Sequence, residues 1–176
     1  MHGAPECIFE AEAIAARVRQ LGREIRGRAR ERSLVLLGVL QGACVFATDL
    51  ARALGPPLEL ALVQARSYGT GTVSSGRIEV GEMETGLLRG ATVLVADTVL
   101  DSGRTLAELC TRLQTLGAAE VWTCVLLEKE EPRAAAVHPD FVGFRAPGRF
   151  LVGYGLDRAG RYRALPYIGA VDENVR

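Results

Sequence analysis

Apolar residues along this chain alternate between a helical spacing and short continuous runs. In residues Glu12–Arg26 they recur at steps of three and four, which predicts a helix with one buried stripe. The members of that stripe are Ile14, Val18, Leu21 and Ile25. Ser33–Leu40 is a nearly unbroken apolar run, and it predicts a buried strand. The first part of the chain therefore predicts a helix followed by an interior strand.

The same alternation continues to the end of the chain. A second helix is predicted at Cys44–Leu54, where Gly55-Pro56-Pro57 would stop it, and Leu58–Ala65 predicts a second strand. Ser67–Glu84 is rich in Gly, Ser and Thr, and we expect a long mobile loop with a weak hairpin. The remaining predictions are strands at Thr92–Ala96, Val121–Leu127, Phe141–Phe144 and Phe150–Tyr154, and a helix at Leu106–Leu116 closed by Gly117. Strands that alternate with helices indicate a parallel α/β sheet.

Composition narrows the class of protein. The 176 residues suit one domain, and 21 basic against 21 acidic residues give a formal net charge of zero. This balance offers no electrostatic case for a nucleic-acid or membrane-surface partner. The apolar runs are too short to span a membrane, and the first residues do not resemble a signal peptide, so we expect a cytoplasmic protein. The four cysteines lack metal-type spacing and are expected to be free thiols.

The segment Ala96–Thr105 has the richest chemistry, because it runs from a strand through a tight loop into a helix. Ligands of parallel sheets bind at the carboxyl ends of strands, and a helix N-terminus offers unpaired N–H groups to phosphate. Two carboxylates would repel a plain phosphate, but they suit a sugar phosphate that also carries hydroxyls or Mg²⁺. The alternative at this point is that Asp101 only caps the helix and Asp97 only ends the strand.

Several motifs in order resemble one known family. Val93–Thr105 resembles the phosphoribosyl pyrophosphate motif of type I phosphoribosyltransferases. Further motifs narrow the resemblance to the hypoxanthine-guanine phosphoribosyltransferase family: Val39–Gly42, Arg66–Tyr68, Leu126–Lys129 with Pro132-Arg133, Asp140–Phe144, Phe150–Asp157 and Tyr162-Arg163. The resemblance covers nearly the whole chain, and it also implies a cis peptide between Leu40 and Gln41.

The fold that this resemblance implies is the type I phosphoribosyltransferase fold. It is an α/β fold with a mainly parallel twisted sheet flanked by helices, and a small hood built from the N- and C-terminal segments. A single domain would cover residues 1–176, with the core at about 30–145 and the hood at about 1–29 and 146–176. The implied partners are small molecules, a 6-oxopurine and phosphoribosyl pyrophosphate, with no nucleic acid or membrane. A homodimer or homotetramer is also implied.

The resemblance assigns a role to each group of residues. Phosphoribosyl pyrophosphate and its 5′-phosphate would be held by Asp97, Thr98, Ser102, Gly103, Arg104 and Thr105. The pyrophosphate would meet Leu40, Gln41, Gly42, Ser67, Tyr68, Arg133 and Arg163. The purine would meet Lys129, Phe150, Leu151 and Asp157, and Mg²⁺ would bind Asp97 and Asp157. Asp101 would be the catalytic residue, exchanging a proton with the purine near N7.

The implied function is purine salvage. A 6-oxopurine, hypoxanthine and/or guanine, would react with phosphoribosyl pyrophosphate to give the nucleoside monophosphate and pyrophosphate. Taken singly, Lys129 is also compatible with a solvated charge run, Phe150 with a core aromatic and Arg163 with a surface arginine.

Two residues depart from the family pattern, because Thr98 stands where a second acidic residue is usual and Gln41 where lysine is frequent. Each change removes a charge, so we predict weakened binding of phosphoribosyl pyrophosphate, which Thr98→Asp should tighten. Two other functions stay open: a weakly active or inactive regulatory paralogue that binds nucleotide or phosphoribosyl pyrophosphate, and a phosphoribosyltransferase for another base.

Overall fold

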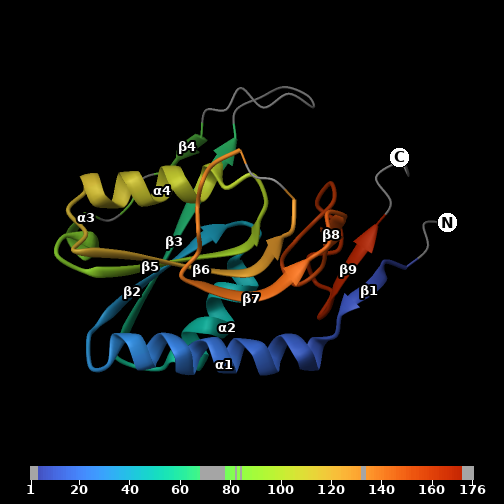
Figure 1. Cartoon of the computed structure of the whole chain (residues 1–176), viewed down its shortest axis with the longest axis horizontal. Coiled ribbons are helices and arrows are strands. Elements are labelled where there is room, and N and C mark those ends of the chain that lie inside the picture. Colours follow the sequence, from blue (N-terminus) through green and yellow to red (C-terminus); the bar gives the residue numbers. More distant parts are fainter. Residues whose placement is uncertain (1–3, 68–77, 82, 84, 132–133, 172–176) are drawn as a thin grey trace.

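Two sheets organise the computed structural model, which describes residues 4–67, 78–81, 83, 85–131 and 134–171 (Figure 1). The larger sheet has the strand order β4-β3-β2-β5-β6-β7. Its members are β2 (Leu34–Leu40), β3 (Leu58–Ser67), β4 (Ile78–Val80), β5 (Thr92–Leu100), β6 (Glu120–Lys129) and β7 (Phe141–Ala146). All neighbours are parallel except β4, which runs antiparallel to the end of β3.

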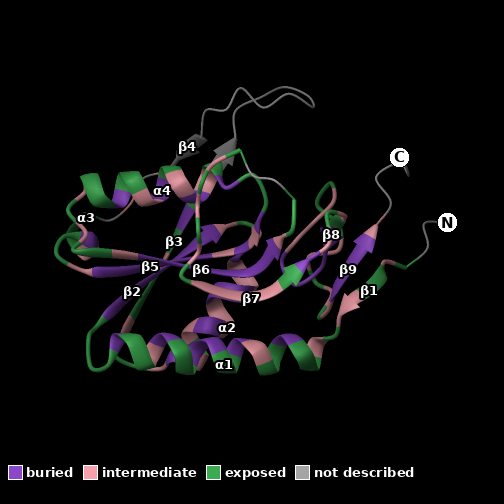
Figure 2. Cartoon of the chain, viewed as in Figure 1, coloured by how far each residue is buried: buried purple, intermediate pink, exposed green. Residues whose placement is uncertain are grey.

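Helices cover both faces of the larger sheet. Helices α1 (Ala11–Ala29) and α2 (Cys44–Leu54) lie on one face, and α3 (Thr85–Leu88) and α4 (Arg104–Thr115) lie on the other (Figure 1). Successive residues of a strand point to opposite faces. Leu34 and Leu36 of β2 therefore join the core beneath α1 and α2, whereas Val35 and Leu37 join the core beneath α4. The central strands are accordingly buried on both faces (Figure 2).

A smaller antiparallel sheet combines the two ends of the chain. Its order is β1-β9-β8, formed by β1 (Glu6–Phe9), β9 (Ile168–Val171) and β8 (Phe150–Val152). This sheet lies beside the end of the larger sheet at which β7 finishes (Figure 1). Helix α1 follows β1, but it packs against α2 and β7 of the larger sheet.

Most of the predicted elements are confirmed, with differences at their ends. The stripe of the first helix is buried as predicted, and α2 has the predicted bounds. The weak hairpin is confirmed in the pairing of β3 with β4, although residues 68–77 of the predicted loop lie outside the described residues. The third strand was predicted to end at Ala96, but β5 continues to Leu100. The sequence patterns did not predict β1, α3 or β9.

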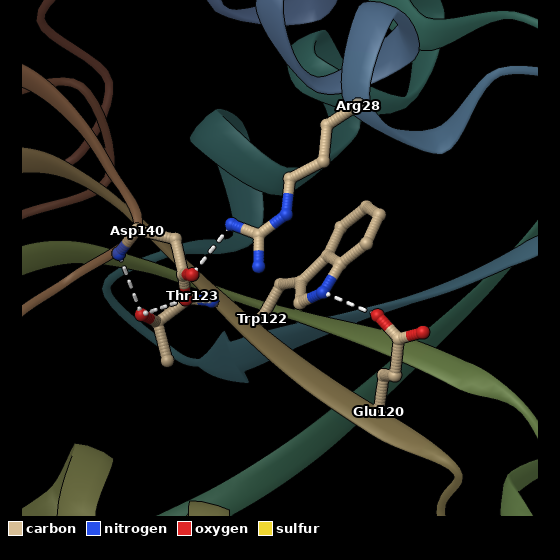
Figure 3. A network of polar contacts seen from close by, with 5 residues as sticks. All are labelled: Arg28, Glu120, Trp122, Thr123 and Asp140. Carbon is tan, nitrogen blue, oxygen red and sulfur yellow. Dashed lines mark hydrogen bonds and ion pairs between the residues drawn. The ribbon is translucent and has the colours of Figure 1, made fainter.

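The C-terminal half of α1 is joined to the sheet by a polar network (Figure 3). The guanidinium of Arg28 lies 4.4 Å from the ring centre of Trp122 and pairs with Asp140 at 2.6 Å. The other carboxylate oxygen of Asp140 accepts hydrogen bonds from the backbone N–H of Thr123, at 2.9 Å, and from its hydroxyl. The indole N–H of Trp122 donates to Glu120 at 3.0 Å. These contacts fix α1 against the edge formed by β6 and β7.

No helix in the described part of the chain is both long and apolar enough to cross a bilayer. The four cysteines are free thiols, and burial raises the pKa of Cys124.

Candidate active site

The candidate site lies at the carboxyl ends of β2 and β5, the two adjacent strands from which the chain continues in opposite directions across the sheet. Such a switch point is where open α/β sheets bind ligands. A cavity of about 430 Å³ opens there. Its lining includes these predicted residues: Leu40, Gln41, Gly42, Asp101, Lys129, Phe150, Leu151, Asp157 and Arg163. Four further lining residues were not predicted: Gln64, Ala65, Val99 and Leu156.

Asp101 and Lys129 form an ion pair inside this cavity. The pairing of β5 with β6 places Leu100 opposite Glu128, so Asp101, just after the end of β5, comes close to Lys129, the last residue of β6. The Lys129 Nζ atom lies 3.4 Å from Asp101 Oδ2. The Lys129 side chain is 15% exposed, whereas that of Asp101 is 64% exposed. The site therefore combines a nearly buried cation with an accessible carboxylate.

The turn into α4 has the features expected of a phosphate site. Residue 103 precedes the helix with φ of 76°, a conformation that glycine adopts without strain, and it makes no side-chain cap hydrogen bond. The N-cap residue of α4 is Gly103, so Asp101 lies two positions before the cap, and its carboxylate pairs with Lys129. Ser102 and Arg104 are exposed, and Thr105 is half-buried. The helix is anchored below the turn by Leu106, Leu109 and Leu113, all buried.

Asp97 and Thr98 lie inside β5, and neither lines the cavity formed by the described residues. The Asp97 carboxylate accepts the N–H of Thr98 at 2.7 Å, and burial raises its pKa to about 7 against the lowering effect of that hydrogen bond. Thr98 is fully buried, and its hydroxyl donates to the Gly42 carbonyl oxygen at 3.0 Å. The Thr98 hydroxyl thus forms a hydrogen bond within the protein, whereas the family resemblance implied a ligand contact for this residue.

Arg163 is held by three acceptors from two parts of the chain. Its Nη1 donates to the Gly155 carbonyl oxygen at 2.7 Å, and its Nη2 lies 2.7 Å from Asp157 Oδ1. The same Nη2 donates to Gln41 Oε1 at 3.1 Å. The second Asp157 oxygen accepts the Gly160 N–H at 2.7 Å. The peptide between Leu40 and Gln41 is cis, as the resemblance predicted.

The smaller sheet supplies the remaining wall of the cavity. Phe150 is one of few large apolar side chains that are exposed among the described residues, at 37%, and it begins β8. The Arg158 guanidinium lies 5.9 Å from the centre of its ring. Leu151, the next residue, is buried and pairs with Ala170 of β9. An exposed aromatic face beside a cavity suits stacking with a planar ligand.

Among the described residues, no three His, Cys, Asp or Glu side chains form a ready metal site. Mg²⁺ commonly binds through one or two carboxylates together with substrate phosphates and waters. Asp157 is a carboxylate of the cavity wall, whereas Asp97 lies within β5 outside the lining, so the residues fit a site with few protein carboxylates rather than a cage built by the protein alone.

Three predicted contacts cannot be placed in this geometry. Tyr68 and Arg133 lie outside the described residues, and Ser67 is the last residue of β3, with a side chain that is not described. The unpredicted lining residues carried no separate signal, because Gln64 and Ala65 lie in a predicted strand and Val99 lies in the loop motif at a position to which the resemblance assigns no role. Leu156 lies between two motif residues and reads as a core leucine.

Residues 6–159 match the family described as Phosphoribosyl transferase domain. The chain is 41% identical to a hypoxanthine-guanine phosphoribosyltransferase of Mycobacterium avium over 96% of this chain and 86% of that protein. It is 38% identical to the bifunctional protein TilS/HprT of Listeria innocua over 96% of this chain, but it spans only 26% of that longer protein. A hypoxanthine phosphoribosyltransferase structure from Staphylococcus aureus superimposes with a TM-score of 0.89 at 30% identity, covering 95% of this chain and 91% of the other.

The fold and the switch-point site define a phosphoribosyltransferase domain, in agreement with the family match. Identity over nearly the full length of both proteins narrows the class further. The chain belongs to the hypoxanthine-guanine phosphoribosyltransferase family.

Proposed function

We propose that this protein is a purine salvage enzyme that transfers the phosphoribosyl group of phosphoribosyl pyrophosphate to a 6-oxopurine, hypoxanthine and/or guanine. The observation that carries the proposal is the composition of one cavity. It combines polar and aromatic groups that suit a purine, namely the Asp101–Lys129 pair and the exposed ring of Phe150, with a cation that suits a phosphate, the guanidinium of Arg163. A base and an anion thus each have suitable partners.

Catalysis in this proposal is positioning with electrostatic stabilisation. As pyrophosphate departs, positive charge develops at C1 of the ribose, and the purine nitrogen attacks that carbon. Lys129 donates a hydrogen bond to the purine O6, which selects 6-oxopurines over adenine. Asp101 exchanges a proton with the base near N7, and its 64% exposure leaves it accessible to a ligand. Phe150 stacks on the base, and the Leu151 backbone contacts its edge.

The anionic end of the substrate is assigned to two places. The turn at Ser102, Gly103, Arg104 and Thr105 receives the 5′-phosphate, supported by the N–H groups at the start of α4. Arg163, with the backbone of the loop Leu40–Gln41–Gly42, meets the pyrophosphate. Mg²⁺ is the proposed cofactor; it would be held by Asp157 and Asp97 and would neutralise phosphate charge.

The test is nucleotide formation by the purified protein with Mg²⁺, phosphoribosyl pyrophosphate and, separately, hypoxanthine, guanine, xanthine and adenine. We expect turnover of a 6-oxopurine, and Asp101→Ala should lower it by about 10² to 10⁴-fold. Glu108→Ala, an exposed acidic residue on α4, is the matched control and should leave turnover unchanged. Nucleotide binding without turnover of any base would favour a regulatory paralogue, and turnover of a different base would reassign the substrate.

The wider properties that we propose follow the same family. They are a homodimer or homotetramer, a cytoplasmic location supported by the free thiols, and a hood formed by residues of about 1–29 and 146–176 over a core of about 30–145. The small sheet of β1, β9 and β8 supports the hood, because it joins both ends of the chain beside the cavity, whereas α1, within the first of these segments, packs against α2 and β7.

A further inference from the structure

The contact between Gln41 and Arg163 joins two walls of the cavity. Gln41 belongs to the turn after β2, whereas Arg163 lies beyond β8, 122 positions later in the chain. The acceptor in this contact is the side-chain oxygen Gln41 Oε1, at 3.1 Å from Arg163 Nη2. The same nitrogen meets Asp157 at 2.7 Å, and Nη1 donates to Gly155 at 2.7 Å. Both terminal nitrogens of the guanidinium are therefore restrained.

Restraint matters for a guanidinium because its donors are fixed in one plane. An arginine has five N–H donors and no acceptor, so three contacts still leave donors for a phosphate. Its fork matches two phosphate oxygens only when the plane is turned toward them. An arginine that is already oriented loses less side-chain freedom on binding than a mobile one.

We propose that Gln41 is a positioning residue that fixes the Arg163 guanidinium, through Oε1, in the orientation that meets pyrophosphate. This inference rests on the proposed function of the cavity. A lysine at position 41 would add a charge, but an ammonium group has only donors and cannot accept from Arg163. Glutamine in place of the lysine that is frequent in the family therefore removes one positive charge from the loop. It also supplies a side-chain oxygen that accepts a hydrogen bond from Arg163.

The backbone that carries Gln41 is itself held. The buried hydroxyl of Thr98 donates to the carbonyl oxygen of Gly42 at 3.0 Å. The Cys44 N–H donates to the Gln41 carbonyl oxygen at 3.2 Å, and the Ala43 N–H donates to that of Val39 at 3.0 Å. Because the backbone of this turn is fixed, the Gln41 side-chain amide has a defined place from which to orient Arg163. Residues 98 and 41, the two departures from the family pattern, therefore act on the same turn.

The experiment is a double-mutant cycle read by isothermal titration with magnesium pyrophosphate, which does not depend on turnover. The proteins are the wild type, Gln41→Met, Arg163→Met and the double variant, with Gln41→Ala as a second form of the first change. Gln20→Met, at an exposed position on α1, is the matched control. We expect Gln41→Met to weaken binding by about fivefold to tenfold, the effect of one ordinary hydrogen bond, because Gln41 acts on the anion only indirectly.

In the Arg163→Met background the Gln41 change should have no further effect, because the residue acts through Arg163. An unchanged dissociation constant for both Gln41 variants would overturn the inference. The inference would also be overturned if Gln41→Met weakened the binding of magnesium pyrophosphate equally in the wild type and in Arg163→Met. Gln41 would then contact the anion directly. If the wild type neither bound magnesium pyrophosphate nor formed nucleotide, the proposed function itself would fail, and this inference with it.

Discussion

The hydroxyl of Thr98 connects the end of β5 to the turn after β2. It is fully buried and donates to the Gly42 carbonyl oxygen at 3.0 Å. Thr98→Val keeps the shape of the side chain but leaves that carbonyl without this donor, so we expect the free energy of unfolding to fall by about 1–3 kcal/mol. Urea denaturation followed by circular dichroism measures the change. Thr98→Ser keeps the hydroxyl and should lose less than Thr98→Val; the opposite order would contradict the prediction.

This geometry changes what is expected of Thr98→Asp. From the missing charge alone, an aspartate should bind phosphoribosyl pyrophosphate more tightly. A carboxylate at a fully buried position beside a carbonyl oxygen has no donor there, and burying an unpaired charge is costly. We therefore expect any gain in affinity to be opposed by a loss of stability at least as large as that of Thr98→Val.

Asp97 gives the molecule a pH dependence of stability. Burial raises its pKa to about 7, while an aspartate in an unfolded chain has a pKa of about 3.9. Between these values the folded state binds the proton more strongly than the unfolded state does. Its contribution therefore makes the free energy of unfolding decrease as pH rises, by at most about 1.4 kcal/mol per pH unit, until the change flattens above about pH 7.

Asp97→Asn removes the titrating carboxyl and with it this contribution to the pH dependence of the free energy of unfolding. Urea denaturation in metal-free buffer from pH 4 to pH 8 should show the variant gaining stability relative to the wild type up to about pH 7, and a constant difference above it. A difference that stayed constant over the whole range would show that the folded carboxyl has an ordinary pKa.

At the scale of elements, the helices were predicted well from their periodic burial, and the interior strands from continuous apolar runs, because these strands are buried on both faces. The end of β5 was missed because Asp97 and Thr98 look like turn residues, yet pairing with β6 extends the strand through them. Strands β1 and β9 are short, and each is stabilised by its partner near the other end of the chain, which no local pattern shows. The predicted residues that line the cavity came from ordered motifs, whereas Gln64 lay in a predicted strand and Val99 lay in the loop motif without an assigned role.

Helices α1 and α2 cross at a glycine. A Cβ atom on Gly22 would lie 2.8 Å from the Ala53 carbonyl oxygen, whereas one on Gly27 of the same helix would meet nothing within 4 Å. We expect Gly22→Ala to lower the free energy of unfolding by about 1–3 kcal/mol through overpacking. Gly27→Ala should raise it by up to about 1 kcal/mol, because alanine is the better helix former. Thermal and urea unfolding compare the two; the same sign for both would refute this account of the crossing.

At the scale of the whole molecule, the cavity depends on two sheets that have separate hydrogen-bond ladders but share one hydrophobic core. The larger sheet positions Asp101 and Lys129 at adjacent strand ends. Phe150 and Leu151 belong to β8, whose pairing partner is β9, and β9 is paired on its other side by β1. The proposed base contacts of the smaller sheet therefore rest on a strand from the opposite end of the chain.

Removal of residues 1–9 should affect the binding of the base more than the binding of phosphoribosyl pyrophosphate. The deletion removes β1 but leaves α1, which begins at Ala11. Without β1, β9 loses one of its two neighbours and β8 is less firmly held. We expect the KM for the base to rise by about threefold to tenfold, a loss of about 1 kcal/mol, while the KM for phosphoribosyl pyrophosphate changes little. Steady-state kinetics with each substrate varied in turn measures the two constants.

The control for this deletion is Glu6→Gln, which removes only an ion pair with Arg149 at 2.6 Å. The Glu6 side chain is 65% exposed, and exposed pairs contribute about 0–1 kcal/mol, so this variant should match the wild type. A parallel rise of both KM values in the deletion would mean that β1 supports the whole fold. An unchanged KM for the base would mean that β9 alone holds β8. Only a selective rise assigns the smaller sheet to base binding, because the turn proposed to bind phosphate leads into α4, which packs on the other sheet.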